Sequence, residues 1–504
     1  MTWARTDKGD WSGSSAPVIM QAMARRKNAT ANPQLTFAVL ALGITAYSVL
    51  QSLVLPALPT LQHKLHTSQD TATWILTAYL LSASVFTPIL GRVGDMVGKA
   101  RMFTVTLVAL GAGSLLAALT SSIDVMILAR VIQGVSGAIL PLAFGIVRDE
   151  MPPLRVRGLI GAMASLTAAA GGLGVVLGGV ISDALGYHFL FWIPFILAVI
   201  AGIAAHFFVP ESPVRTPGRV NWVAAVLLSA WLVALLVSAS EGPTWGWAST
   251  RTIGLFVVAV VLLLVWIGVE VRSALPLIDM RMMRLRAVWI NNMVAFLFGV
   301  GLYSALAFIP SFVQTSPSHG YGFGASAATS GLYLAPLTVG MFFGGMLSGP
   351  LSNRFRPKAV LVGACIFSIP GFFVMALAHA HEWEVFGASG LIGLGFGFAF
   401  ATMTNLIVDA VPREQTGVAT GMNANIRTIG GSIGAALMAS IVTSGVVGAG
   451  VPKESGYTYG FAAMGVAAML AALAALLVPV RKIPLATSAD GSTLTCAPGE
   501  RISR

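Results

Sequence analysis

The sequence predicts an all-α integral membrane protein with fourteen transmembrane helices, and two observations lead to this fold class. The first is composition: of 504 residues, 56% are hydrophobic and only 10% are charged, and the mean hydropathy is +0.82. A soluble chain has about a quarter charged residues, and no water-soluble domain could bury so much apolar surface. The second is a succession of long apolar runs. In lipid these runs can face outward, so a bilayer is the solvent that the chain requires.

Fourteen apolar runs are each close to the length of about 20 residues that a helix needs to cross a bilayer. We treat the first run as a retained helix, because it is too long for a signal peptide and many spans follow it. The polar segments 1–34 and 481–504 are low in aromatic residues, and we expect both tails to be disordered. In chain order, the predicted spans are 35–58, 70–90, 102–120, 124–148, 158–183, 188–209, 220–240, 251–271, 288–313, 326–351, 357–380, 383–410, 416–445 and 459–480.

The distribution of Lys and Arg predicts which side of the membrane holds the termini. An even number of spans places both termini on one side, and 25 of the 30 basic residues lie on that side. Lys64, Arg251 and Lys453 lie in the opposite loops, whereas Arg130 and Arg427 lie inside spans. Because short cytoplasmic loops are rich in Lys and Arg, both termini are predicted to be cytoplasmic. The net charge of +11 is therefore explained by basic loops that orient the protein in the membrane. No nucleic-acid partner is expected.

A short motif occurs twice in the chain. Gly91-Arg-Val-Gly-Asp95 follows the second predicted span, and Gly349-Pro-Leu-Ser-Asn353 follows the tenth, eight helices later. Two six-helix halves would give an offset of six, so two helices look inserted between the halves. Transporters built from such repeats place the substrate site between the halves, near the middle of the bilayer. The predicted parts are a first half at 35–209, inserted helices and linkers at 210–287, and a second half at 288–480.

The first copy of this motif carries a set of glycines and charges that favours a gating function. Its glycines allow a tight turn between two helices, and its aspartate can meet a helix N-terminus or an Arg at the cytoplasmic face. The alternative is a basic turn that only obeys the positive-inside rule. A turn that only sets the orientation of the protein in the membrane would not require glycine and aspartate at this spacing. The gating residues are predicted to be Gly91, Asp95, Gly98, Lys99 and Arg101.

This motif resembles the loop 2–3 signature of the major facilitator superfamily, and the resemblance covers nearly all of residues 35–480. It implies the major facilitator fold, as a monomer in a bacterial inner membrane. It also implies that Asp95 and Arg101 latch the two halves together in the outward-facing state. The thirteenth span is similar to that of drug-exporting relatives, and Asp95 is expected to contact the N-terminus of this span.

Two features of that thirteenth span matter for packing and charge. Gly430 and Gly431 are small residues that let helix backbones approach closely. Arg427 is placed inside the span and needs a partner, which Asn423 and Asn425 can provide only in part.

Arg130 and Gln133 lie almost one turn apart in the fourth span and share a helix face. An arginine inside a span costs at least about 2.5–3.5 kcal/mol unless it is paired or hydrated, so it should face a cavity. The pattern resembles the superfamily's fourth-helix motif, whose arginine is associated with proton coupling. The alternative is an arginine that reaches the outer interface, because Asp124 marks the start of the span six residues earlier.

The fifth span is rich in glycine, with Gly174, Gly178 and Gly179 at spacings that favour close helix packing. It resembles the fifth-helix signature of antiporters, G-x-x-x-G-P-x-x-G-G. Ala170 and Val175 replace its first glycine and its proline. Packing alone would also explain the run.

The first span departs from the drug exporters, which carry an aspartate nine residues before the helix-ending proline. Aligned on Pro59, that position is Leu50, and no carboxylate lies near the middle of any predicted span. Proton antiport needs a titrating group, and acids inside the membrane are the usual carriers. The remaining candidates are Asp124 and Asp409, although either would also serve as an interfacial helix cap.

By resemblance, the first, fourth, ninth and twelfth helices line the central cavity. Ligand sites are mostly apolar with a few polar groups, and polar residues on these helices are candidates for substrate contact. Asparagines there could instead bind neighbouring helices. The candidates are Tyr47, Gln51, Arg130, Gln133, Asn291, Asn292, Tyr303, Thr402 and Asn405, with Phe396, Phe398 and Phe400 as aromatic neighbours.

These features favour a secondary transporter that exports drugs or amphipathic natural products, with or without proton antiport. An uptake symporter or an uncoupled facilitator of the same fold is the alternative. An antiporter-like subunit of a membrane complex would need a chain of Lys, Glu and His through the membrane, and no lysine lies inside a predicted span. An enzyme is not expected, because no His/Asp/Glu cluster with ligand spacing occurs. The sequence predicts no cofactor and no metal, and it has no phosphate-binding loop for ATP.

Overall fold

The computed structural model describes residues 32–54, 57–67, 69–212, 219–274, 276–444, 446–447 and 451–479. The predicted tails lie outside these ranges, apart from residues 32–34, where Asn32 caps the first helix and Pro33 begins it.

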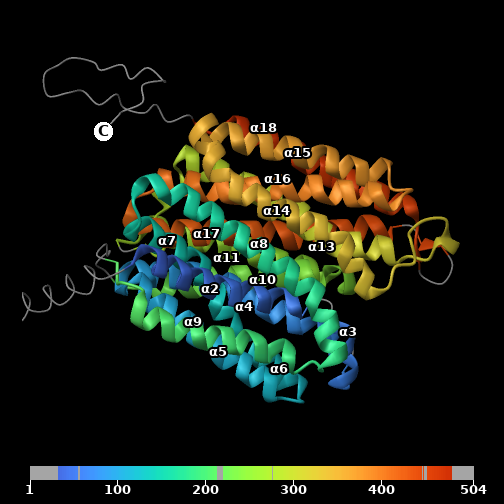
Figure 1. Cartoon of the computed structure of the whole chain (residues 1–504), viewed down its shortest axis with the longest axis horizontal. Helices are drawn as coiled ribbons and strands as arrows, with labels where there is room; N and C mark the ends of the chain where they lie inside the picture. The colour runs from blue at the N-terminus through green and yellow to red at the C-terminus, as the bar shows by residue number, and fades with distance from the viewer. Residues whose placement is uncertain are drawn as a thin grey trace, which may run out of the picture.

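The described chain forms a bundle of long helices that run side by side (Figure 1). The first helix group consists of α2 (Pro33–Leu53), α3 (Leu58–Lys64), α4 (Gln69–Val97), α5 (Lys99–Leu119), α6 (Ile123–Gly134), η1 (Val135–Ala138), α7 (Ile139–Glu150), α8 (Pro153–Ala184) and α9 (Phe189–Phe208). The pair of helices that the sequence predicted as inserted, called the inserted pair below, consists of α10 (Trp222–Trp245) and α11 (Thr250–Arg272), followed by the short α12 (Met280–Met283). The second helix group consists of α13 (Arg286–Gln314), η2 (Pro317–His319), α14 (Ala327–Phe355), α15 (Pro357–Leu377), α16 (Glu382–Ala410), η3 (Arg413–Gln415), α17 (Thr416–Thr443), β1 (Val446–Val447), β2 (Val451–Pro452) and α18 (Glu454–Leu476).

Fourteen helical segments in the described residues are long and apolar enough to cross a membrane, which confirms the predicted number and order. The fourth of these spans is made of α6, η1 and α7 in line. The prediction was wrong at the end of the first span, because α2 ends at Leu53 and a separate short helix, α3, follows.

The repeated motif also differs from its prediction as a turn between helices. Gly91 lies inside α4, and Gly349 lies inside α14. A Cβ added at Gly91 would come within 2.8 Å of the carbonyl oxygen of Gly417 on α17. Gly91 therefore permits a close approach of two helices, and only the last glycine of the motif, Gly98, forms the turn.

The turns that follow the two motif copies share an unusual backbone conformation. Gly98 has φ +135° and Arg356 has φ +68°, and both residues lie seven positions after the first glycine of their motif. A positive φ suits glycine, whereas a residue with a Cβ is strained there. Arg356 is therefore a strained position that the first copy of the motif avoids by having Gly98.

Replacing Arg356 by glycine is expected to stabilise the protein by about 1 kcal/mol, because it removes this backbone strain. Thermal unfolding of the detergent-solubilised protein would show this as a higher Tm. Arg354→Gly is the matched control: this residue lies in the last turn of α14, where glycine should lower stability by about 0.5–1 kcal/mol. Equal effects of the two substitutions would contradict the strain assigned to Arg356.

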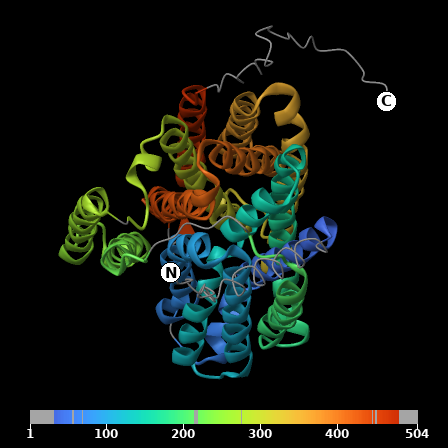
Figure 2. The same ribbon diagram turned by 90° about the vertical axis from the view of Figure 1, so that its left-hand side faces the viewer.

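The bundle has separate hydrophobic cores for its two helix groups. The first core is built by residues between Val39 and Val209, joined by Val408. The second is built by residues between Ile290 and Val478. A third cluster joins α10 to the ends of α4 and α17, so the inserted pair lies at one edge of the bundle (Figure 2). The central contact between the groups is therefore not one continuous apolar core.

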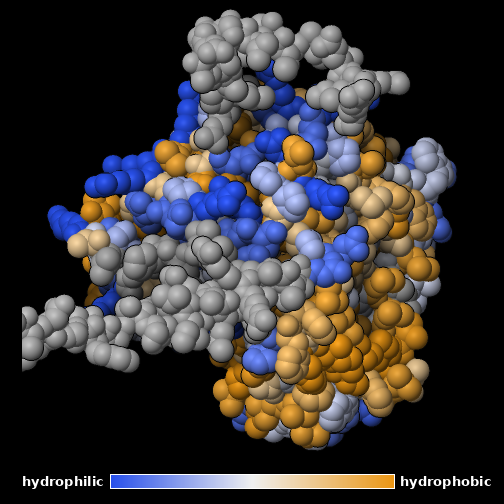
Figure 3. Space-filling view, turned by 60° about the vertical axis from the view of Figure 1, so that its left-hand side comes forward, coloured by the Kyte–Doolittle hydropathy of each residue, from blue (hydrophilic) through white to orange (hydrophobic). Residues whose placement is uncertain are grey.

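One end of the bundle holds both Pro33 and Leu476, and we call it the terminal end; the opposite end is the far end. Hydrophilic side chains gather at the terminal end, whereas the flank is hydrophobic (Figure 3). Apolar side chains are exposed along the flank, including Leu173 on α8 and Val257 on α11. Such exposure is expected of a surface that faces lipid.

Candidate functional site

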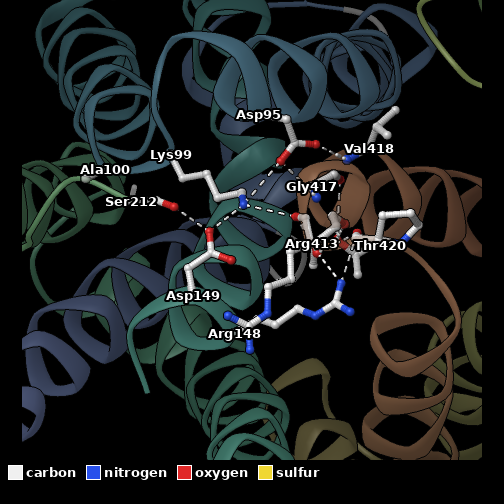
Figure 4. A network of polar contacts seen from close by, with 12 residues as sticks. Asp95, Lys99, Ala100, Arg148, Asp149, Ser212, Arg413, Gly417, Val418 and Thr420 are labelled. Atoms are coloured by element: carbon white, nitrogen blue, oxygen red, sulfur yellow. Dashed lines mark hydrogen bonds and ion pairs between the residues drawn. The ribbon is translucent and has the colours of Figure 1, made fainter. Parts of the chain in front are cut away.

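The two helix groups are joined at the terminal end by a buried aspartate. Asp95, in the last turn of α4, is 0% exposed and accepts hydrogen bonds from the backbone N–H groups of Gly417 (3.4 Å) and Val418 (3.2 Å). These N–H groups lie in the first turn of α17, where a helix leaves donors unpaired and has a partial positive charge. The contact that the sequence predicted between Asp95 and this N-terminus is present (Figure 4).

Lys99 lies beside Asp95 and links three parts of the chain. Its Nζ is 3.5 Å from Asp95 and 2.6 Å from Asp149, and it donates to the carbonyl of Arg413 across the groups (3.3 Å). Ser212 also donates to Asp149. The lysine is 0% exposed, so its charge depends on these partners instead of water.

Arg148 forms a second connection that sequence reasoning missed. From the end of α7 it donates to the carbonyls of Val411 (2.7 Å) and Pro412 (3.1 Å) and to the Thr416 hydroxyl (2.5 Å). It therefore binds the loop that precedes α17. The signal in the sequence was a run of three charges, Arg148-Asp149-Glu150, at the end of an apolar span.

Arg101 was predicted to latch the two halves, but it contacts its own helix group. Its Nε is 3.4 Å from Glu211, and the side chain is 66% exposed. Glu211 also accepts from the backbone N–H groups of Ala100 and Arg101, so it caps the start of α5. A Cβ at Gly98 would come within 2.4 Å of the Glu211 carboxylate. Gly98 and Arg101 thus hold Glu211 in place and do not reach the second group.

A second line of contact joins α8 to the second group at the terminal end. Arg157 pairs with Asp409 at 2.8 Å, and its carbonyl accepts from Asn405 (3.4 Å). Further along, a Cβ at Gly161 would lie 2.7 Å from the carbonyl oxygen of Gly345 on α14. Asp409 is thus a partner in an ion pair near the terminal end. The other coupling candidate, Asp124, is exposed in the first turn of α6 at the far end.

Arg130 is fully buried, which rules out the alternative that it reaches the outer interface. Its Nε donates to the carbonyl of Ile75 (2.8 Å), and one terminal nitrogen donates to Gln133 (2.7 Å). Gln133 in turn donates to Ser114 at 3.2 Å. The guanidinium carbon lies 4.4 Å from the centre of the Tyr79 ring, a residue that the sequence did not single out. The other terminal nitrogen has no hydrogen-bond partner among the described residues.

The predicted substrate-cavity residues divide into two sets. Asn291, Asn292, Thr402 and Asn405 are at most 5% exposed. Asn291 donates to the Met403 carbonyl, Asn292 accepts from Asn423, and the Thr402 hydroxyl bonds to that of Ser348. These residues therefore join helices to one another. The second set, which is partly accessible, comprises Tyr47, Gln51 and Tyr303.

The predicted packing glycines differ in how closely a neighbouring helix approaches them. A Cβ at Gly174 would lie 2.7 Å from Ser52 on α2. One at Gly430 would meet the Phe296 carbonyl, and one at Gly431 would meet the Tyr303 ring, both on α13. At Gly179 an added Cβ would meet nothing within 4 Å, so no close helix approach occurs there, whereas Gly178 is buried.

Within the described residues, no group of three or more His, Cys, Asp or Glu side chains is arranged to hold a metal ion. The site is instead a set of cross-group contacts at one end of a helical bundle, with the buried Arg130 further inside.

Residues 40–435 match the family model described as Major Facilitator Superfamily. The chain belongs to the major facilitator superfamily. It is a multi-pass membrane protein of a transporter family, with bacterial relatives. It is 27% identical over 423 residues to the tetracenomycin C resistance and export protein of Streptomyces glaucescens, covering 82% of this chain and 77% of that one.

Two further comparisons concern a second bacterial relative and a solved structure. Multidrug resistance protein 3 of Bacillus subtilis is 29% identical over 390 residues, covering 75% of this chain and 73% of that one. The crystal structure of the human organic anion transporter MFSD10 (TETRAN) superposes with a TM-score of 0.63 at 18% identity. It covers 88% of this chain and 100% of that one. At 18% identity, the similarity to the MFSD10 structure shows the fold alone.

Proposed function

We propose that this major facilitator protein is a secondary transporter that exports amphipathic small molecules from a bacterial cell by alternating access. The terminal end faces the cytoplasm, and the parts that move are the two halves at 35–209 and 288–480. The observation that carries the proposal is the contact of Asp95, Lys99 and Arg148 with the start of α17. It closes the terminal end with polar bonds, which can break and re-form, instead of a continuous apolar core.

Two further observations support export and this orientation. Relatives named for drug resistance or export align with most of the chain. Basic side chains dominate the terminal end, as the positive-inside rule expects of a cytoplasmic face. Under this proposal, the closed terminal end separates the substrate site from the cytoplasm.

For coupling, we propose that transport is driven by protons, and that Arg130, held by Gln133, serves this coupling through its permanent positive charge while the contact at the terminal end opens and closes. Uncoupled facilitation is the second candidate, and two observations favour it. Leu50, where drug-exporting relatives carry aspartate, is fully buried in an apolar core. No described carboxylate pairs with Arg130.

Transport by reconstituted protein under an imposed pH gradient tests the proposal. Wild-type protein should move an amphipathic dye faster with the gradient than without it. In Arg130→Ala the gradient-driven increase in transport rate should fall roughly tenfold. The reason is that Gln133 and the Ile75 carbonyl lose a charged partner worth about 1.5 kcal/mol or more.

A labelling experiment tests the orientation separately from coupling. In intact cells a membrane-impermeant maleimide should label a cysteine at the exposed far-end residue Ser318 and not one at Arg354. Labelling only at Arg354 would reverse the proposed orientation. Transport that ignores the gradient in both wild type and Arg130→Ala would favour uncoupled facilitation.

A further inference from the structure

Two arginines lie inside the spans that the sequence predicted, one in each helix group, and neither has an acidic partner among the described residues. Arg130 belongs to α6 and Arg427 to α17. Among the described residues, no carboxylate oxygen lies within 4.0 Å of either guanidinium. A guanidinium stays protonated in a protein, and an unpaired charge inside a membrane protein is costly to maintain. The interior between the groups therefore carries an excess of positive charge.

Aromatic side chains connect the two arginines. The guanidinium of Arg130 lies over the Tyr79 ring at 4.4 Å, and that of Arg427 lies over the Phe400 ring at 4.3 Å. Tyr47, on α2, is an electrostatic neighbour of both Tyr79 and Arg427. The result is one tract of arginines and aromatic rings that runs from the first helix group to the second.

The Arg427 end of this tract is the accessible end. Arg130 and Tyr79 are at most 1% exposed, whereas Arg427, Tyr47, Tyr303 and Phe400 are all partly accessible. Gly431 leaves space for the Tyr303 ring against α17, four residues beyond Arg427. Partial exposure of four neighbouring side chains inside the bundle marks a place that water or a ligand can reach.

Arg427 also keeps its hydrogen-bonding capacity free. Among the described residues it has a ring contact with Phe400 and electrostatic neighbours in Tyr47 and Tyr303, but no hydrogen bond. Asn423 and Asn425 were predicted to be partial partners of Arg427. Instead, Asn423 donates to Asn292, and Asn425 donates to the Ser84 carbonyl. A guanidinium has five N–H donors in a planar fork, and all five remain available here.

The position of Arg427 places it near the middle of the bilayer. It is the twelfth residue of α17, so it lies about 16 Å along the helix from the terminal end at about 1.5 Å per residue. The hydrocarbon core is about 30 Å thick. This is the depth at which transporters of repeated halves bind substrate.

We propose that Arg427, with Tyr47, Tyr303 and Phe400, forms an anion-binding subsite, and that the substrates are planar aromatic anions such as carboxylates or ionised phenols. This rests on the proposed transport function. The fork of the guanidinium matches a carboxylate in two hydrogen bonds, and its plane stacks on aromatic rings. Excess positive charge attracts anions and repels cations. A packing role beside Phe400 alone would leave five donors without use.

Binding to purified protein, separate from transport, is the test. The probes are anthraquinone-2-carboxylate, its carboxamide and its 2-aminomethyl analogue, which share a planar ring system and carry charges of −1, 0 and +1. Wild-type protein should bind the carboxylate about tenfold or more tighter than the amide, because a charged hydrogen bond is lost with the amide. The cation should bind most weakly.

The variants isolate Arg427. Arg427→Gln should abolish the preference for the carboxylate while amide binding stays within about twofold, and Arg427→Lys, which keeps the charge without the fork, should be intermediate. Arg251→Gln removes a positive charge from an exposed far-end position and should change nothing. Gel filtration of both Arg427 variants checks folding, and Arg427→Lys keeps the test valid if Arg427→Gln does not fold.

Equal binding of the three probes by wild type, or a preference that survives Arg427→Gln, would overturn the anion site. Proteoliposome transport of the same probes then separates the two proposals. Binding of the carboxylate without transport of any probe would support the subsite and overturn the export function. Transport of the cation in preference to the carboxylate would support transport and overturn the subsite.

Discussion

Replacing Asp95 by asparagine is expected to open the terminal end and reduce transport by at least tenfold. The carboxylate accepts from two backbone N–H groups at the start of α17 and pairs with Lys99. Asparagine keeps one acceptor oxygen but loses the negative charge and the second acceptor, which together contribute about 2 kcal/mol at a helix N-terminus, a shift of roughly 30-fold toward the open state. Lys99 keeps its bond to Asp149, so the first helix group should stay folded.

Spin labels on two exposed residues at the terminal end would measure this opening. Leu154 lies on the first group and is 93% exposed, and Arg354 is exposed on the second. With cysteines at both positions and Cys496 replaced by serine, the inter-label distance should be short in the parent protein and longer in Asp95→Asn. Asp124→Asn, the same chemical change at an exposed far-end position, should leave the distance unaltered. An unaltered distance in Asp95→Asn would show that this contact does not close the terminal end.

A valine at Gly161 is expected to open the same end without any change in charge, and to abolish transport. An added Cβ would lie 2.7 Å from the Gly345 carbonyl oxygen on α14, and backbone cannot move aside as a side chain can. Overpacking of this kind costs about 1–3 kcal/mol in the closed state. The open state, in which α8 and α14 separate at this end, removes the clash.

Gly158→Val is the matched control, because it lies one turn earlier on the same helix and an added Cβ there would meet nothing within 4 Å. The spin-label distance should lengthen in Gly161→Val and stay short in Gly158→Val. Opening in both variants would indicate a general loss of helix stability, and opening in neither would contradict the tight contact between α8 and α14.

Much of the fold could be predicted because a transmembrane span is a property of one stretch of sequence. Length and apolar content fixed the fourteen spans, and the structure confirmed their number and order. Where the backbone turns was harder to predict. The glycines near Gly91 were expected to form a turn, but α4 continues to Val97, because a glycine that permits helix packing and one that permits a turn look identical in sequence.

The site could be predicted only where a motif specified its partner. The contact of Asp95 with the start of α17 followed from such a motif, whereas those of Arg148 did not. Which carbonyl an arginine meets depends on how two helix groups pack, and no local pattern records that. For the same reason Arg101, exposed beside Glu211, was assigned to the wrong helix group. Buried asparagines such as Asn291 were equally ambiguous, because a cavity and a helix contact both favour a polar residue.

The inserted pair makes the two lateral edges of the protein unequal. On one edge α10 packs against both α4 and α17. Toward the far end Thr77 bonds to Ser240 of α10, and Trp247, just after α10, donates to Ser440 of α17. Among the described residues, no further helix covers the other edge, between α8 and α14, where Leu173 and Phe343 are exposed. Among the described elements, the extra pair of helices therefore separates one edge of the contact between the two groups from lipid, whereas at the other edge α8 and α14 face lipid directly.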